Sequence, residues 1–235
     1  MNARALPLYA TILIFVVAYA LAYSQFPNIL STRVIGNLLT DNAYLGIVGV
    51  GMTLVILSGG IDLSVGAVIA FSGVFIAVML RDTGLHPLAV FAILLALTTA
   101  FGAAMGFLID RLAMPAFIVT LAGMFLARGA AYLLSVQSVP ITHPFFGQLQ
   151  NAYVLMPGKG RLTLIGVLML AVFAVGMVIA HRTRFGTSVY ALGGGAQTAR
   201  LMGVPQGRTT VLVYGFSGLM AGLSGIVFAV YTGSG

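Results

Sequence analysis

The segment His181–Arg208, HRTRFGTSVYALGGGAQTARLMGVPQGR, is the long polar interruption around which the apolar remainder of the chain is arranged. Within it, Ala196–Met202 predicts two helical turns, since Gly203 stands at the usual C-terminal stop and Pro205 follows. The segment also carries four of the eleven Lys and Arg residues, namely Arg182, Arg184, Arg200 and Arg208. An exposed loop of this kind between apolar runs indicates a surface that contacts a soluble protein.

The composition predicts an integral membrane protein. Of the 235 residues, 60% are hydrophobic and 6% are charged, with a mean hydropathy of +1.10, whereas soluble domains carry about a quarter charged residues. The net charge of +7 fits cations that flank membrane spans, and no basic stripe with interleaved aromatics indicates nucleic-acid binding. The chain has no cysteine, three histidines and four acidic residues, so we expect no thiol chemistry and no metal site.

The apolar runs predict an all-α polytopic bundle of about seven transmembrane helices, in a single domain that covers residues 1–235. The expected crossings are Leu8–Tyr23, Ala43–Leu57, Val65–Leu80, Pro87–Ile109, Pro115–Leu134, Leu162–Ala180 and Thr209–Tyr231. The run Leu8–Tyr23 lacks a signal-peptide cleavage site, so we expect it to be retained.

Three stretches depart from simple spans. Gln25–Asn42 predicts a short interfacial helix or a bent entry segment. Ser58–Ser64, SGGIDLS, breaks two apolar pieces and predicts a discontinuous, partly re-entrant segment, which is tolerated where protein or a water-filled cavity surrounds it. Ser135–Arg161 predicts an irregular loop outside the membrane, which either folds back onto the membrane or stays free of it.

The basic residues predict the orientation. With the N-terminus in the cytoplasm, seven crossings place Arg4, Arg111 and the four arginines of the polar segment inside. Arg33, Arg81, Lys159 and Arg161 then lie outside. The loop 182–208 is therefore expected to be cytoplasmic.

Two glycine pairs predict close helix contacts. Gly102 with Gly106, and Gly218 with Gly222, have the GxxxG spacing that lets helix backbones approach in lipid. Either static packing or a helix that rocks fits this pattern, and static packing is the simpler interpretation.

Two charges fall inside predicted membrane segments, where ionisable residues usually have a partner or a function. Asp62 either caps the following helix, accepting from the backbone N–H groups of Ser64 or Val65, or contacts a substrate. Arg128 either extends toward the outer interface or has a role in a polar pathway or an ion pair.

The sequence shows no catalytic machinery. Gly193-Gly194-Gly195 follows no predicted strand and precedes no Gly-Lys-Ser/Thr, so a P-loop is excluded. Paired catalytic carboxylates, a serine elbow and a histidine-rich helix are also missing from the sequence. We expect neither an enzyme nor a cofactor.

Several motifs together resemble the permease subunit of ribose-type ABC importers. These are SGGIDLSVG (58–66), PAFIVTLAGMFLARG (115–129), RTRFG (182–186) and YALGG…ARLMGV (190–204). TRVIGNLLTDNAYLGI (32–47) and the stretch around Ile141–Pro144 resemble the galactofuranose branch of that family. The likeness extends over the whole chain.

The resemblance implies a permease of the bacterial inner membrane that imports a monosaccharide. It implies three partners: an ABC ATPase, a second permease, identical or different, and a periplasmic sugar-binding protein, besides membrane lipid. It also implies that 190–204 holds a coupling helix for the ATPase, with Gly193, Gly194, Ala196, Gln197, Ala199, Arg200, Leu201, Met202 and Gly203 as the contact residues. Gly195, Ala196 and Gln197 depart from the family pattern, which is more acidic there, so the matching ATPase is left open.

The resemblance also implies about three further helices, so the chain is expected to be incomplete at its C-terminus. Because sugars are rich in hydroxyl groups, side chains that form hydrogen bonds and one aromatic face are candidates for the sugar pathway: Asn37, Asn42, Asp62, Ser64, Phe117, Thr120 and Arg128. Two alternatives stay open, an ion-coupled secondary carrier, which suits a broken helix with an intramembrane acid, and an inactive permease remnant.

Overall fold

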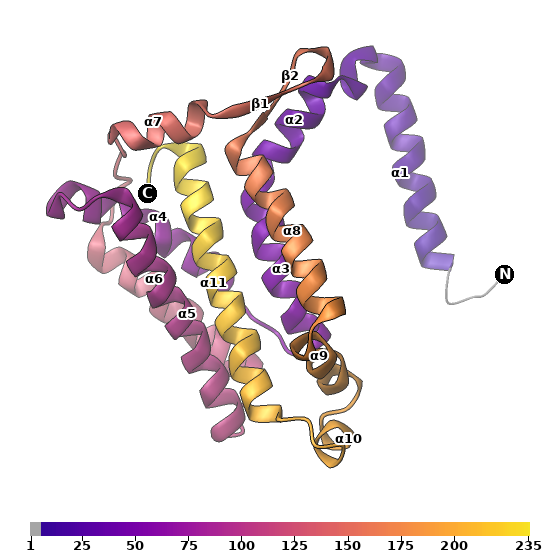
Figure 1. Ribbon diagram of the computed structural model, residues 1–235, viewed down its shortest axis with the longest axis vertical. Helices are drawn as coiled ribbons and strands as arrows, with labels where there is room; N and C mark the ends of the chain where they lie inside the picture. Colours follow the sequence, from indigo (N-terminus) through magenta and orange to yellow (C-terminus); the bar gives the residue numbers. More distant parts are fainter. Residues whose placement is uncertain (1–5) are drawn as a thin grey trace.

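A computed structural model describes residues 6–235 as a bundle of helices with one short β-hairpin, built around a central helix (Figure 1). Arg4 lies outside the described residues. The helices are α1 (Leu6–Gln25), α2 (Thr32–Asp41), α3 (Ala43–Leu57), α4 (Val65–Thr83), α5 (Pro87–Arg111), α6 (Ala116–Leu134), α7 (Pro144–Asn151), α8 (Leu164–Arg182), α9 (Arg184–Gly194), α10 (Ala196–Leu201) and α11 (Gln206–Thr232). Short 3₁₀ turns span Pro27–Leu30 and Pro157–Lys159, and strands β1 (Tyr153–Met156) and β2 (Gly160–Thr163) form a hairpin.

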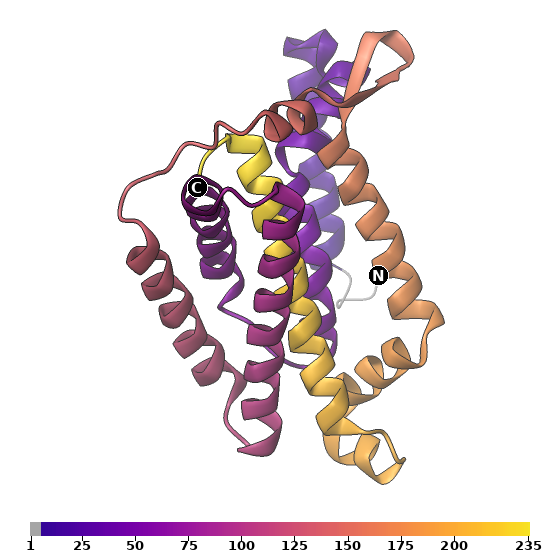
Figure 2. The same cartoon turned by 60° about the vertical axis from the view of Figure 1, so that its left-hand side comes forward.

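Six of the described helices are long and apolar enough to cross a membrane, and the bent pair α2–α3 makes a seventh candidate. The pair bends by 57° at Asn42. The sequence predicted either a short helix or a bent entry segment before α3, and α2 is a short helix that enters α3 through this bend. The loop that carries α9 and α10 lies at one end of the bundle, which we call the α10 end. The strands β1 and β2 lie at the other, which we call the hairpin end (Figures 1 and 2).

The central helix α11 packs most closely against α5, and the two predicted glycine pairs face each other across this contact. A Cβ atom on Gly102 would overlap the carbonyl oxygen of Tyr214 and lie 3.2 Å from the Cα of Gly218. A Cβ atom on Gly218 would overlap the carbonyl oxygen of Thr98. The expected close backbone contact is therefore confirmed, because no larger side chain fits there.

The break between α3 and α4 lies along α11. Residues of α3 run antiparallel to α11, since Ser224 of α11 donates to the Tyr44 carbonyl while the Gly51 position abuts Met220 and Ser217. Gly59, at φ +81°, lets the chain turn back, and α4 then follows α11 in the parallel direction. Residues 60–64 then form neither helix nor strand, so the discontinuous segment expected from the Gly-Gly break is present.

The connection between α6 and α8 is more regular than the sequence predicted. The expectation of an irregular loop was wrong for Pro144–Asn151, which is helical, and for the β1–β2 hairpin. His143 starts α7 by accepting the Phe145 N–H on its ring nitrogen, with Pro144 in the first turn. Phe146 is 2% exposed, so the connection packs onto the bundle.

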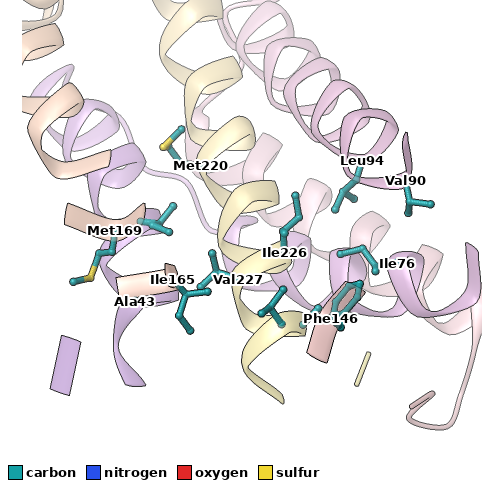
Figure 3. Close-up of a cluster of buried hydrophobic side chains, with 13 residues drawn as sticks. Ala43, Ile76, Val90, Leu94, Phe146, Ile165, Met169, Met220, Ile226 and Val227 are labelled. Carbon is teal, nitrogen blue, oxygen red and sulfur yellow. The ribbon is translucent and has the colours of Figure 1, made fainter. Parts of the chain in front are cut away.

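A buried apolar cluster joins both sides of the bundle at the hairpin end (Figure 3). Ile226 and Val227 of α11 lie between Met169 of α8 on one side and Ile76 of α4 and Leu94 of α5 on the other. Phe146 of α7 closes this cluster from the end of the bundle. The outward faces of the helices are apolar as well, as lipid requires.

We predict that Gly102→Ala destabilises the protein by about 1–3 kcal/mol, because the methyl group overpacks the α5–α11 contact. Thermal unfolding of the detergent-purified chain measures the effect. Gly129→Ala is the matched control, since a Cβ atom at that helical position meets no heavy atom within 4 Å. Equal stability of the two variants would contradict the assigned contact.

Candidate functional site

The buried carboxylate of Asp62 organises the break between α3 and α4. The backbone N–H and the hydroxyl of Ser64 donate to its Oδ1 atom over 2.9 and 2.6 Å. The hydroxyl of Ser217, at the middle of α11, donates to Oδ2 over 2.7 Å. Asp62 is 2% exposed, so these three donors replace the water that the carboxylate loses. The expected bond from the Ser64 N–H is present, and the geometry favours the capping interpretation.

A second hydrogen bond fastens the same break to α11. The Tyr214 hydroxyl donates to the carbonyl oxygen of Ile61 over 3.1 Å. Tyr214 and Ser217 are three residues apart and therefore share one face of α11. A Cβ atom on Gly60 would lie 2.6 Å from the Tyr214 hydroxyl oxygen, so glycine is needed for the close approach. The non-helical segment is thus bonded to α11 at two successive positions, Ile61 and Asp62.

Helix α9 packs against the start of this break. A Cβ atom on Gly193 would overlap the carbonyl oxygen of Leu57, the last residue of α3. Val189 of α9 is buried in a cluster with residues of α3 and α11, among them Val55 and Val213. Leu192 of α9 is buried as well. The base of the polar loop is therefore packed against both helices that the Asp62 bonds connect.

Helix α10 is the exposed tip of the polar loop, and its bounds confirm the short helix predicted from the sequence. Gly203, at φ +80°, ends it, with its N–H bonded to the Arg200 carbonyl over 3.0 Å. Leu201 and Met202 are 84% and 78% exposed, whereas Ala199 is 2% exposed and anchors the helix. Gly194, Ala196, Gln197 and Arg200 are exposed too. The loop therefore has a packed base and a free apolar and basic tip.

The other candidate pathway residues do not converge on Asp62. Asn37 lies at the hairpin end, and Asn42 donates to the Leu38 carbonyl at the α2–α3 bend. Phe117 is 52% exposed on the outer face of α6, while buried Thr120 donates to the carbonyl of Ala116 in its own helix. Ser64, in contrast, is bonded to Asp62.

Arg128 is exposed near the hairpin end, beside a pocket that Ser138 and Ser234 also line. Its position suits a side chain that extends toward the interface from a membrane helix. Within residues 6–235 the salt bridge found joins Arg81 to Asp82, which are adjacent and exposed.

Sequence reasoning missed Ser217, Tyr214 and helix α9. Ser217 and Tyr214 are separated from Asp62 by some 150 residues, and only the packing of α11 brings them together. The run Arg184–Gly194 has the signal of a helix start in Thr183, whose hydroxyl accepts the Gly186 N–H over 3.1 Å. The helix ends in Gly193 and Gly194 and is followed by Gly195, a run of glycines that does not predict a helix.

We predict that Ser217→Ala lowers the free energy of unfolding by about 1–3 kcal/mol, because it leaves Oδ2 of a buried carboxylate without a donor. Thermal unfolding in detergent is again the measurement. Ser188→Ala serves as the control, since that hydroxyl is exposed and donates within its own helix, to the Arg184 carbonyl. If Ser217→Ala lowers the free energy of unfolding no more than Ser188→Ala does, the structural role assigned to Asp62 is wrong.

Comparison with known proteins identifies the family. Residues 34–235 match the family described as "Branched-chain amino acid transport system / permease component". The chain is 56% identical to the inner membrane ABC transporter permease protein YjfF of Escherichia coli K12, over 99% of this chain and 70% of that protein. It is 36% identical to the fructose import permease protein FruG of Bifidobacterium longum, over 100% and 70% of the two chains.

A third relative, the ribose import permease protein RbsC of Escherichia coli K12, is 34% identical over 92% of this chain and 67% of its own length. No solved structure matches. The matches cover the broken segment, the polar loop and the glycine pairs described above, and the helices suit an inner-membrane, multi-pass protein. The chain therefore belongs to the branched-chain amino acid transport system permease-component family, and within it to the ABC transporter permeases of the ribose type.

Proposed function

We propose that the chain translocates a monosaccharide as the membrane subunit of an ABC importer, and that α10 is the docking surface for its ATPase. An ABC permease works with a separate ATPase subunit and a substrate-binding protein, so the chain is a transport component and no enzyme. A second permease, identical or different, completes the proposed assembly. The docking end is then cytoplasmic, as the distribution of arginines predicts.

The exposed tip of α10 is the observation that carries this proposal. Leu201 and Met202 are largely exposed beside Arg200, on a helix that projects past the ends of α8 and α11 (Figure 1). Lipid can cover apolar side chains within the membrane, but apolar side chains at a projecting tip indicate a protein partner. Gly193, Gly194, Ala196, Gln197, Ala199 and Gly203 shape and anchor the tip.

The packing of α9 supports a route by which the ATPase moves the bundle. A displaced α10 carries α9 with it, and Gly193 of α9 contacts the end of α3 directly. From there the break passes the displacement to α11 through Asp62 and Ser217. Helices that share tightly packed interfaces move as units, so α3 and α11 tilt together and open the path to alternate sides.

The proposed substrate is a monosaccharide that adopts a furanose ring. FruG and RbsC are named for the import of fructose and ribose, both of which form such rings. The motifs at 32–47 favour galactofuranose within that class. The pathway residues proposed are Asn37, Asn42, Asp62, Ser64, Phe117, Thr120 and Arg128. Because Asp62 and Ser64 bond each other away from solvent, we propose that they shape the path and do not touch the sugar.

We predict that Arg200→Glu abolishes retention of the cognate ATPase in a pulldown from membranes that co-express both proteins, because the change reverses the charge of the tip. Gly203→Pro has the same effect, since proline cannot adopt φ +80°. Arg81→Glu is the control, an exposed arginine at the other end of the bundle.

Retention of the ATPase by both α10 variants would contradict the docking assignment. Sugar uptake that persists without the ATPase would indicate a secondary carrier instead. Normal ATPase retention without uptake, in cells that supply the other subunits, would indicate an inactive remnant.

A further inference from the structure

A pocket at the hairpin end carries two arginines that the transport function does not use. It lies between α2 and the β1–β2 hairpin and has a volume of about 780 Å³. Arg33 and Asn37, one helical turn apart on α2, form one wall, and Leu155, Met156 and Arg161 of the hairpin form the other. The lining contains no acidic residue, and no salt bridge joins either arginine to another described residue.

The walls of this pocket are held together, so Arg33 and Arg161 line the same space from opposite sides. The carbonyl oxygen of Arg161 abuts Gly36, where a Cβ atom would overlap it. The hydroxyls of Thr40 and Thr163 are bonded over 2.8 Å. The guanidinium carbon of Arg161 also lies 4.6 Å from the centre of the Tyr153 ring, a cation–π contact that restricts the side chain. Binding an anion there therefore requires little reorganisation of the hairpin.

The chain positions of the arginines place the pocket at the level of lipid headgroups. Helix α1 has 20 residues, about 30 Å at 1.5 Å per residue, which matches the hydrocarbon thickness of a bilayer. Helix α1 ends at Gln25, eight residues before Arg33. On the other wall of the pocket, the hairpin leads into the span α8, which begins three residues after Arg161. Both arginines thus lie just beyond the end of an apolar span.

The surroundings of the pocket are apolar where acyl chains would run. Leu155 is 69% exposed and Val154 is 59% exposed on the hairpin, and Leu38 is 62% exposed on α2. A short amphipathic helix with arginine on its polar face and aliphatic side chains on the other is typical of a membrane interface. A pocket for a freely diffusing anion or an acidic protein needs no such aliphatic border.

We propose that Arg33 and Arg161 bind the phosphate of an anionic phospholipid in the leaflet at the hairpin end. Guanidinium groups bind phosphate oxygens through paired hydrogen bonds, and two of them match a headgroup that keeps a net negative charge. The bound lipid links α2 to the hairpin and so stabilises the entry to α3 and α8.

The test measures phosphatidylglycerol binding to the delipidated, detergent-purified chain by native mass spectrometry and by the shift in melting temperature. We expect binding to weaken about fivefold for Arg33→Gln or Arg161→Gln and roughly 25-fold for the double variant, from the usual contribution of one arginine at an anionic membrane surface. Arg33→Lys and Arg161→Lys keep the charge and are expected to retain part of the affinity. Arg81→Gln, an arginine at the same end that is paired with Asp82, is expected to bind like the unchanged chain.

Several outcomes would overturn the proposal. One is equal binding of phosphatidylcholine and phosphatidylglycerol, and another is unchanged phosphatidylglycerol binding in the double variant. A melting shift reproduced by inorganic phosphate alone would assign the pocket to a free anion. If the double variant no longer captures the substrate-binding protein but binds phosphatidylglycerol as before, the pocket is a docking site for that protein. Both arginines are exposed, so we expect every variant to fold. The melting temperature of each variant, measured without lipid, checks this.

Discussion

The close approach of α5 and α11 is the contact on which the rest of the bundle depends. Helices in lipid gain no hydrophobic energy by associating, so their contact depends on van der Waals packing and on hydrogen bonds. Opposed glycines at 102 and 218 bring the two backbones together, and α11 is thereby fixed along the middle of the protein. The other crossings apart from α1 then assemble around it, α3 and α8 on one side and α4 to α6 on the other (Figure 1).

A fixed α11 also makes the broken segment possible. Non-helical backbone at membrane depth needs partners for its polar groups, because lipid offers none. Tyr214 and Ser217 provide hydroxyl groups at two points along the break, and Ser64 satisfies the other oxygen of Asp62. A carboxylate is suited to this place, since it accepts from several donors at once and so joins one helix to the start of the next.

The same break connects the two ends of the proposed mechanism. Its first residues lie against α9, at the base of the loop that carries the exposed tip, and its last residues start α4 in the middle of the bundle. A displacement of the loop therefore reaches the interior through backbone contacts and a charged hydrogen bond, without any long flexible side chain. The pocket of Arg33 and Arg161 lies at the opposite end, where lipid binding stabilises the entry to two spans and leaves this route untouched.

The sequence by itself determined the membrane environment, the approximate spans, the helix α10 with its glycine stop and the glycine pairs, because these depend on composition and on local spacing. It also indicated Asp62, since a charge inside an apolar stretch needs a partner, and it provided the Ser64 bond, which is local. The tertiary structure alone decided which glycines face each other, that Ser217 and Tyr214 bond the break, and that α9 abuts Leu57. These contacts join residues far apart in the chain, and in lipid no pattern of hydrophobicity marks which face of a helix meets which neighbour.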